Sequence, residues 1–262
     1  MTLAQRIVCA RAKICDARIP YEVPELDQLA PRPDSVLRVI YLVFTEGYSA
    51  SGGEHVQRLD LAAEAIRLGW LLLRLCPEAE TRGLLALRLL RHGRRSTRTD
   101  AAGDLVPLED QDRSLWDAHE LAIGRAMARD ALRARGHGSY ALQAAIVAVH
   151  AEAGTAAQTD WARIAGLYDR LLHHEPSCVV ALNRAVAIAM RDGPQAGLAR
   201  IEPMLNEPPL ATYHLTHAAH ADLCRRADRL ADARLSYGRA LDLARQEPER
   251  RFLRRRLAEL DA

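Results

Sequence analysis

Three histidines at regular spacing are the first residues whose types and positions suggest chemistry. His214, His217 and His220 follow one another at steps of three, and an i, i+3 pair on a helix can share a metal ion with a third ligand such as Asp222. Each step of three turns the side chain about 60 degrees away from a common line, so all three rings cannot converge. We therefore favour histidines that line the groove of a helical repeat, and we expect no metal and no cofactor.

A polar segment, LEDQDRSLWD, concentrates charge beside a tryptophan. It predicts either a surface that binds a partner or ligand, or a loop whose charges pair locally. In the second case Asp112 or Ser114 caps the next helix, and Trp116 anchors it. The two interpretations have equal weight. The candidate surface in this part of the chain consists of Arg94, Arg95, Asp110, Asp112, Arg113 and Trp116.

Two further candidates lie in the stretch FTEGYSAS, at the end of a predicted helix. Glu46 and Tyr48 there form either a patch on the same surface or ordinary helix-end chemistry. No GxGxxG, Walker lysine, GxSxG or HExxH motif occurs in the sequence, so we expect no enzyme and assign no catalytic residue.

The composition excludes several classes of protein. The 36 basic and 34 acidic side chains leave a formal charge of only +2, so no chain-wide basic field attracts nucleic acid or anionic lipid. The five cysteines are widely spread without a CxxC pair, which fits neither a disulfide framework nor a zinc site. No apolar run approaches the roughly 20 residues of a membrane span. These features predict a soluble, cytoplasmic protein without a membrane partner.

The elements that must position these residues read as helices throughout, because apolar residues recur at steps of three and four. Asp34 or Ser35 caps a predicted helix that Gly47 closes, and a tight turn is predicted at Ala102–Gly103. An amphipathic segment over 2–17 precedes a linker with four prolines. The other predicted helices in the first half cover residues 56–75, 78–93 and about 114–134.

From residue 139 onward a pattern of small, bulky and packing residues recurs. Its first positions, Ile164, Gly197 and Ala233, are 33 and 36 residues apart, close to the period of about 34 of the tetratricopeptide repeat. Three helix pairs over 139–245 and a basic capping helix after them follow from this pattern. The predicted fold is all-α: helical hairpins stacked as a tetratricopeptide-like solenoid, with a helical front unit.

Several segments together resemble one protein family. The N-terminal stretch TLAQRIVCARAKICDARIPYEVP is similar to the end of region 4 of an extracytoplasmic-function (ECF) sigma factor. The stretches VLRVIYLVFTEGYSAS, RRSTRTDAAGDLVPLEDQDRSLWD, DWARIAGLYDRLL, LNRAVAIAMRDGP and ERRFLRRRLAEL resemble the long tetratricopeptide-like C-terminal extension of one group of these factors. Region 2 and most of region 4 have no counterpart in the 262 residues. Thr45 replaces an expected asparagine, and His220 an expected arginine.

The resemblance implies four parts. They are a remnant of the region 4 recognition helix over 1–18, a Pro-rich linker over 19–33, a helical front unit over 34–135, and the repeats with their capping helix over 136–262. It also implies DNA contacts in a full-length factor, where arginine and glutamine read base edges and later cations hold phosphates. The residues at those positions are Thr2, Gln5, Arg6, Arg11 and Lys13.

The function that these expectations favour is a regulatory or interaction domain of a sigma factor in transcription initiation. Its partners would be core RNA polymerase and promoter DNA in the full-length protein, and other sigma regions or a peptide on the repeat groove. The alternative is a small-molecule-sensing helical domain, with a pocket between the front unit and the repeats. A buried pocket with several convergent polar groups favours the alternative.

Overall fold

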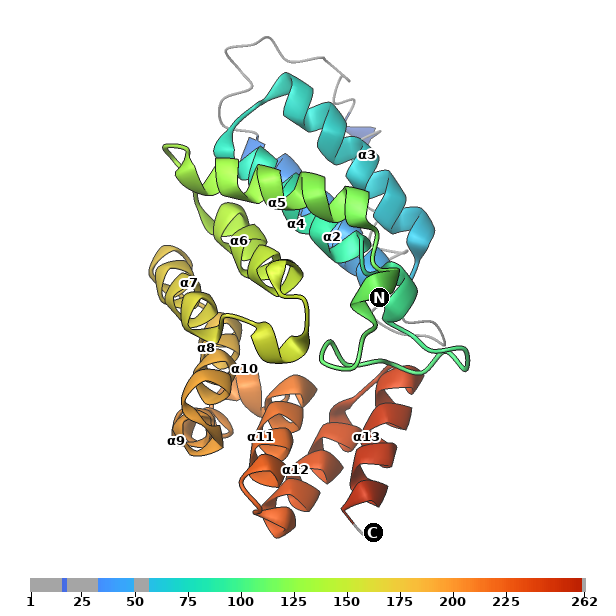
Figure 1. Ribbon diagram of the computed structural model, residues 1–262, viewed down its shortest axis with the longest axis vertical. Coiled ribbons are helices and arrows are strands. Elements are labelled where there is room, and N and C mark those ends of the chain that lie inside the picture. The colour runs from blue at the N-terminus through green and yellow to red at the C-terminus, as the bar shows by residue number, and fades with distance from the viewer. Residues whose placement is uncertain (1–15, 18–32, 50–56, 261–262) are drawn as a thin grey trace. The chain divides into compact units, whose positions relative to one another are not determined.

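The computed structural model describes residues 16–17, 33–49 and 57–260 (Figure 1). Contacts divide the chain into Met1–Val36 and a compact unit, Leu37–Ala262, which carries the core and the candidate site. The prediction of an all-α protein is confirmed: the described residues form helices and connecting loops, and the bridge between Thr99 and Leu105 is isolated. None of the described helices has the length and apolar character needed to span a membrane.

Four helices make up the front of the compact unit. The segment LLALRLL makes α4 apolar on nearly all sides, which is typical of a buried helix, and its residues 83–90 are all buried. α4 contacts α3, α5 and α6. α2 packs Leu37, Ile40 and Phe44 into a core with Ala62 and Ala65 of α3. The bounds are Pro33–Tyr48 for α2, Leu59–Leu75 for α3, Ala79–His92 for α4 and Ala118–Arg133 for α5.

The ends of two of these helices differ from the prediction. Gly47 does not close α2 but lies in its last turn, where a Cβ would come 2.5 Å from the backbone nitrogen of Ala62. A close approach of α3 therefore requires this glycine. At the other end, α2 begins at Pro33, so Asp34 and Ser35 lie within its first turn instead of capping it.

The start of α5 was also predicted wrongly. Asp112 accepts a hydrogen bond from Ser114 N and caps only the short 3-10 helix η3 (Arg113–Leu115). The N-cap of α5 is Asp117, whose Oδ1 accepts from Glu120 N at 3.0 Å. An aspartate followed by a glutamate three residues later is a capping-box pattern, so this N-cap was predictable from the sequence.

The second half of the unit consists of helix pairs in chain order (Figure 1). α6 contacts α7, α8 contacts α9, and α11 contacts α12. Each pair also touches the next, since α7 contacts α8, α9 contacts α11, and α12 contacts α13. This order is compatible with the predicted solenoid. The bounds are Ser139–Glu152 for α6, Trp161–His174 for α7, Cys178–Asp192 for α8, Pro194–Met204 for α9, Pro208–Ala211 for α10, His214–Arg226 for α11, Leu230–Leu243 for α12 and Glu247–Glu259 for α13.

The recurring sequence pattern lies on the buried side of the second helix of each pair. Ile164 of α7, Gly197 of α9 and Ala233 of α12 are buried, as are Ile201 and Tyr237 one turn later. Apolar faces of this kind stabilise neighbouring pairs by removing their surface from water.

The chain between α4 and α5, residues 93–117, forms what we call the front loop. It contains η2 (Arg95–Thr97) and η3, and its tight turn falls at Gly103 as predicted, with φ at 77° and its N–H donating to Asp100 O at 3.0 Å. Its tip lies beside α13 (Figure 1). Arg251 of α13 pairs with Asp104, and Arg251 Nη2 donates to Gly103 O at 3.2 Å.

Candidate functional site

The front loop and the end of α2 bring arginines together around Tyr48. Arg94 Nη2 donates to Tyr48 Oη at 3.2 Å, and the Arg98 guanidinium lies 3.5 Å from the centre of the Tyr48 ring. Arg91 lies 5.4 Å from the same ring. Burial raises the pKa of the Tyr48 phenol, but the charges of Arg94, Arg98 and Arg91 outweigh it, so that pKa falls below its ordinary value.

Trp116 is the centre of a second group of contacts in the same loop. The side chain is buried, as an anchor should be, and its indole Nε1 donates to Thr97 Oγ1 at 2.9 Å. The guanidinium of Arg113 lies 4.9 Å from the ring centre, and that of Arg94 lies 5.6 Å away. Arg94 therefore joins the Tyr48 and Trp116 groups through cation–π contacts and a hydrogen bond.

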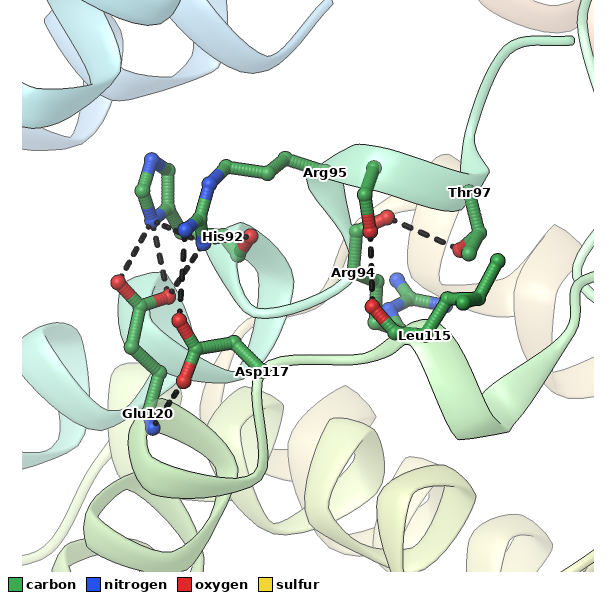
Figure 2. Close-up of polar contacts among 8 residues, drawn as sticks. His92, Arg94, Arg95, Thr97, Leu115, Asp117 and Glu120 are labelled. Carbon is green, nitrogen blue, oxygen red and sulfur yellow. Dashed lines mark hydrogen bonds and ion pairs between the residues drawn. The ribbon is translucent and has the colours of Figure 1, made fainter.

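Arg95 points to a different set of partners. Its guanidinium faces Glu120 and Asp117 at the start of α5 (Figure 2). It lies 3.1 Å from Glu120 Oε2 and 3.3 Å from Asp117 Oδ2. His92 Nδ1 lies 2.9 Å from the same carboxylate of Glu120. Ser96 Oγ also donates to Leu115 O at 2.9 Å and closes the base of the loop. These are local pairs that hold the loop on α5.

The predicted candidate surface is thus divided. Tyr48, Arg94, Arg113 and Trp116 lie together, whereas Arg95 pairs locally. Asp110 and Asp112 are exposed, and hydrogen bonds from Ser114 lower the pKa of Asp112. Glu46 is half-buried on α2. The predicted DNA-contacting residues, Thr2, Gln5, Arg6, Arg11 and Lys13, lie outside the described residues.

Next to Arg113 lies a cavity of about 510 Å³, which we call the loop cavity. This volume is in the range of small-molecule sites, roughly 300–1,000 Å³. The front loop, the end of α6, the 3-10 helix η4 (Ala156–Gln158) and the helices α7, α8 and α11 form its walls. The lining residues are Pro107, Leu108, Glu109, Arg113, His150, Ala156, Ala157, Thr159, Trp161, Val186, Met190, Ala219, Asp222, Leu223 and Arg226.

Arg113 and His150 form the polar part of one wall. Arg113 Nη1 donates to the carbonyl oxygens of His150 and Ala153, each at 2.6 Å, which satisfies the C-terminal end of α6. The imidazole of His150 meets the Trp161 ring edge-on, with the centres 5.2 Å apart. Burial, together with the charges of Arg94 and Arg113, lowers the pKa of His150 to about 4, so the ring is uncharged at neutral pH.

Ion pairs form the opposite wall. Arg226 Nε donates to Asp222 Oδ2 at 2.7 Å, and Arg226 Nη2 donates to Glu109 Oε2 of the front loop at 3.1 Å. The third nitrogen, Nη1, lies 3.3 Å from Met190 Sδ. Arg225 Nη2 donates to the second carboxylate oxygen of Asp222, Oδ1, at 2.7 Å. The charges of this wall are therefore compensated within the protein.

The three regularly spaced histidines have separate partners. His214 Nε2 lies 3.2 Å from Glu249 Oε2, His217 Nε2 lies 2.9 Å from Ala211 O, and His220 Nδ1 lies 2.8 Å from Ser236 Oγ. His217 and His220 are buried within their helix pair, so the expectation that they line a groove was wrong. Among the described residues, no three metal-ligating side chains gather closely enough to hold an ion.

A smaller hollow of about 220 Å³ lies where α2 and α4 meet α6, α7 and α8. Tyr41, Arg91, Gln143, Tyr168 and Asn183 are among its lining residues. Its amide and phenol groups are able to hydrogen-bond to peptide backbone.

Comparison with known proteins gives two matches. Residues 32–132, which include the front helices and the front loop, match a family described as "Family of unknown function (DUF6596)". Over 261 residues, 99% of this chain, the sequence is 45% identical to an uncharacterized protein of Rhizobium meliloti (strain 1021). The chain spans 61% of the length of that relative. Neither description states an activity, so the similarity to a sigma factor stays a prediction.

Proposed function

We propose that this chain is the regulatory and interaction part of an ECF-type sigma factor, and that its helices dock on core RNA polymerase or on the other sigma regions during transcription initiation. The observation that carries this proposal is a set of exposed apolar side chains on α2 and α3. We call them the α2–α3 apolar residues: Val39, Leu42, Leu59, Trp70, Leu71 and Leu75.

The inward faces of α2 and α3 are already buried against each other, because Leu37, Ile40 and Phe44 pack against Ala62 and Ala65. The α2–α3 apolar residues are additional to that core. Val39 is 60% exposed, Leu42 58% and Leu75 69%. Within each helix the exposed side chains include neighbours one turn apart, Val39 and Leu42 on α2 and Leu71 and Leu75 on α3, and contiguous apolar groups of this kind mark interaction sites.

The apolar contribution to such a contact can be estimated from the exposed side chains. Fully burying a leucine or valine contributes about 1.5–3 kcal/mol, so six half-exposed side chains supply on the order of 5–9 kcal/mol before the cost of association is subtracted. Association itself costs about 4–15 kcal/mol, so these side chains contribute to binding without fixing its affinity. The proposed role requires no catalysis.

The position of these residues along the chain also supports the proposal. α2 follows the predicted linker 19–33, and the segment similar to region 4 precedes that linker. A docking surface on α2 and α3 is therefore the part of the extension nearest in sequence to the promoter-reading region. DNA contacts by that region belong to the same proposal and require region 2 and a complete region 4.

Binding measurements with matched surface variants test this proposal. The immobilised chain is exposed to purified core RNA polymerase in one arm and to a region 2–region 4 fragment of an ECF sigma factor in the other. Leu42→Glu and Leu75→Glu place a charge among the α2–α3 apolar residues. Leu235→Glu makes the same change on α12 at a side chain that is 75% exposed.

We expect the chain to bind in at least one arm, with about tenfold or greater weakening by Leu42→Glu and Leu75→Glu and no change by Leu235→Glu. Absence of binding in both arms would overturn the proposal. Equal weakening by all three variants would place the interaction elsewhere on the chain and would overturn the assignment to α2 and α3.

A further inference from the structure

We propose that the loop cavity is a binding site for an uncharged, mainly apolar organic molecule that carries one hydrogen-bonding group. The site lies on the front loop and on helices α6, α7, α8 and α11. The α2–α3 apolar residues are not part of it, so the inference does not depend on the proposed docking to polymerase.

The cavity is a space that small side chains leave open. Ala156, Ala157 and Ala219 contribute to walls whose other apolar members include Trp161 and Met190. Protein interiors contain few voids larger than a water molecule, and larger side chains at these alanines would fill the space. A mainly apolar, partly open pocket of about 510 Å³ has the size of a small-molecule site.

The charges of Arg226 and Asp222 in one wall are already paired within the protein. All three nitrogens of Arg226 have partners, and both oxygens of Asp222 accept hydrogen bonds from arginines. The Arg113 guanidinium already donates to two carbonyl oxygens. A charged ligand would lose its hydration in this mainly apolar space, which costs several kcal/mol, whereas an uncharged ligand would not.

The His150 ring supplies one polar contact. Neither nitrogen of its ring hydrogen-bonds to any described residue, although the ring lines the cavity beside Trp161. An uncharged imidazole offers one donor and one acceptor. A ligand hydroxyl, carbonyl or amide can use either nitrogen, and the flat Trp161 ring provides an aromatic contact next to it.

A pair of fluorescent probes tests the chemical class. N-phenyl-1-naphthylamine is uncharged and has one N–H group, and 8-anilinonaphthalene-1-sulfonate has the same aromatic frame with an added sulfonate. Fluorescence titration of the intact chain should show that the uncharged probe binds about tenfold or more tightly than the sulfonate. Equal affinities, tighter binding of the sulfonate, or no binding of either probe would overturn the proposal.

Variants that fill the cavity test the location. Ala219→Phe adds a ring to one wall, and Ala157→Phe adds it at an exposed wall position that accepts a larger side chain without repacking the core. Ala122→Phe is the matched control on the exposed surface of α5. We expect about tenfold or greater loss of affinity for the uncharged probe in the first two variants and none in the third.

Probe binding that survives both cavity variants would overturn the assignment. Leu75→Glu distinguishes the two proposals, because it should leave probe binding unchanged even where it weakens binding to polymerase. Loss of probe binding in Leu75→Glu together with normal binding in Ala157→Phe would place the probe among the α2–α3 apolar residues instead. Circular dichroism on each variant shows that the helical fold is retained.

Discussion

Arg88 is buried in the middle of α4 without a hydrogen-bond partner. It is 1% exposed, and within the described part of the chain none of its Nε, Nη1 and Nη2 atoms finds an acceptor. Its guanidinium lies 5.0 Å from the centre of the Phe44 ring. We expect Arg88→Met, which keeps most of the volume and removes the charge, to make the protein more stable.

The magnitude follows from the cost of burying the charge. Burial lowers the pKa of Arg88 well below its usual value, to about 9. That difference corresponds to about 5 kcal/mol against the charged form. A depressed pKa of a basic group penalises the folded state at every pH below the folded value, so the cost is fully present at neutral pH. The contact with Phe44 offsets about 1–2 kcal/mol of it.

Urea denaturation followed by far-ultraviolet circular dichroism measures the result. Arg88→Met should raise the free energy of unfolding by about 2–4 kcal/mol, in line with other replacements of buried ions by apolar residues. Arg129→Met, at an exposed position on α5, should change it by no more than about 0.5 kcal/mol. A loss of stability in Arg88→Met would refute this reasoning and would show that the guanidinium has a partner, such as an anion.

Three further predictions concern α4, α6 and α7. The unfolded chain protonates His150 below about pH 6.5 while the folded pKa is about 4, so acidification across that window should cost up to about 3 kcal/mol, and stepped-pH denaturation should show a shallower loss in His150→Gln. Glu80 accepts three backbone N–H groups at the start of α6 at 2.8–3.0 Å, so Glu80→Ala should lower the free energy of unfolding by about 2–4 kcal/mol and Glu80→Gln by less; equal losses in thermal melts would argue against a charge-assisted cap. Gly83→Ala places a Cβ 2.6 Å from Ala141 N and should cost roughly 1–3 kcal/mol, whereas Gly166→Ala meets nothing within 4 Å and should gain about 0.5–1 kcal/mol; the same sign for both in denaturant titrations would remove close helix contact as the cause.

Much of the fold was predictable because helices and helix pairs produce short-range patterns of apolar and small residues in the sequence. Steps of three and four predicted helices in the described residues, and the recurrence through Ile164, Gly197 and Ala233 located the buried side of α7, α9 and α12. The end of α2 was not predictable in the same way. Glycine is common at helix ends, so the sequence predicted that Gly47 closes α2. Gly47 lies inside the helix instead, because Ala62 of α3 approaches it closely.

The site was predictable only where it came from one stretch of chain. Trp116 and Arg113 are close in sequence, and they contact each other as one group. The loop cavity joins residues from positions 107 to 226, and several of its lining residues are alanines that carry no chemical signature. The sequence does not indicate that His150 is a site residue, because its low pKa arises from burial and from arginines of the front loop.

The attachment of the front loop to α13 has a consequence for how the protein is made. Asp104 and Arg251 are separated by 147 residues, so the loop leaves the ribosome long before the helix that holds its tip exists. At about 5–20 residues per second, the loop waits roughly 7–30 s for this partner. The helix pairs can form one after another during that time, since each touches mainly its neighbours. A nascent chain that stops short of α13 lacks the contact that holds the tip of this loop.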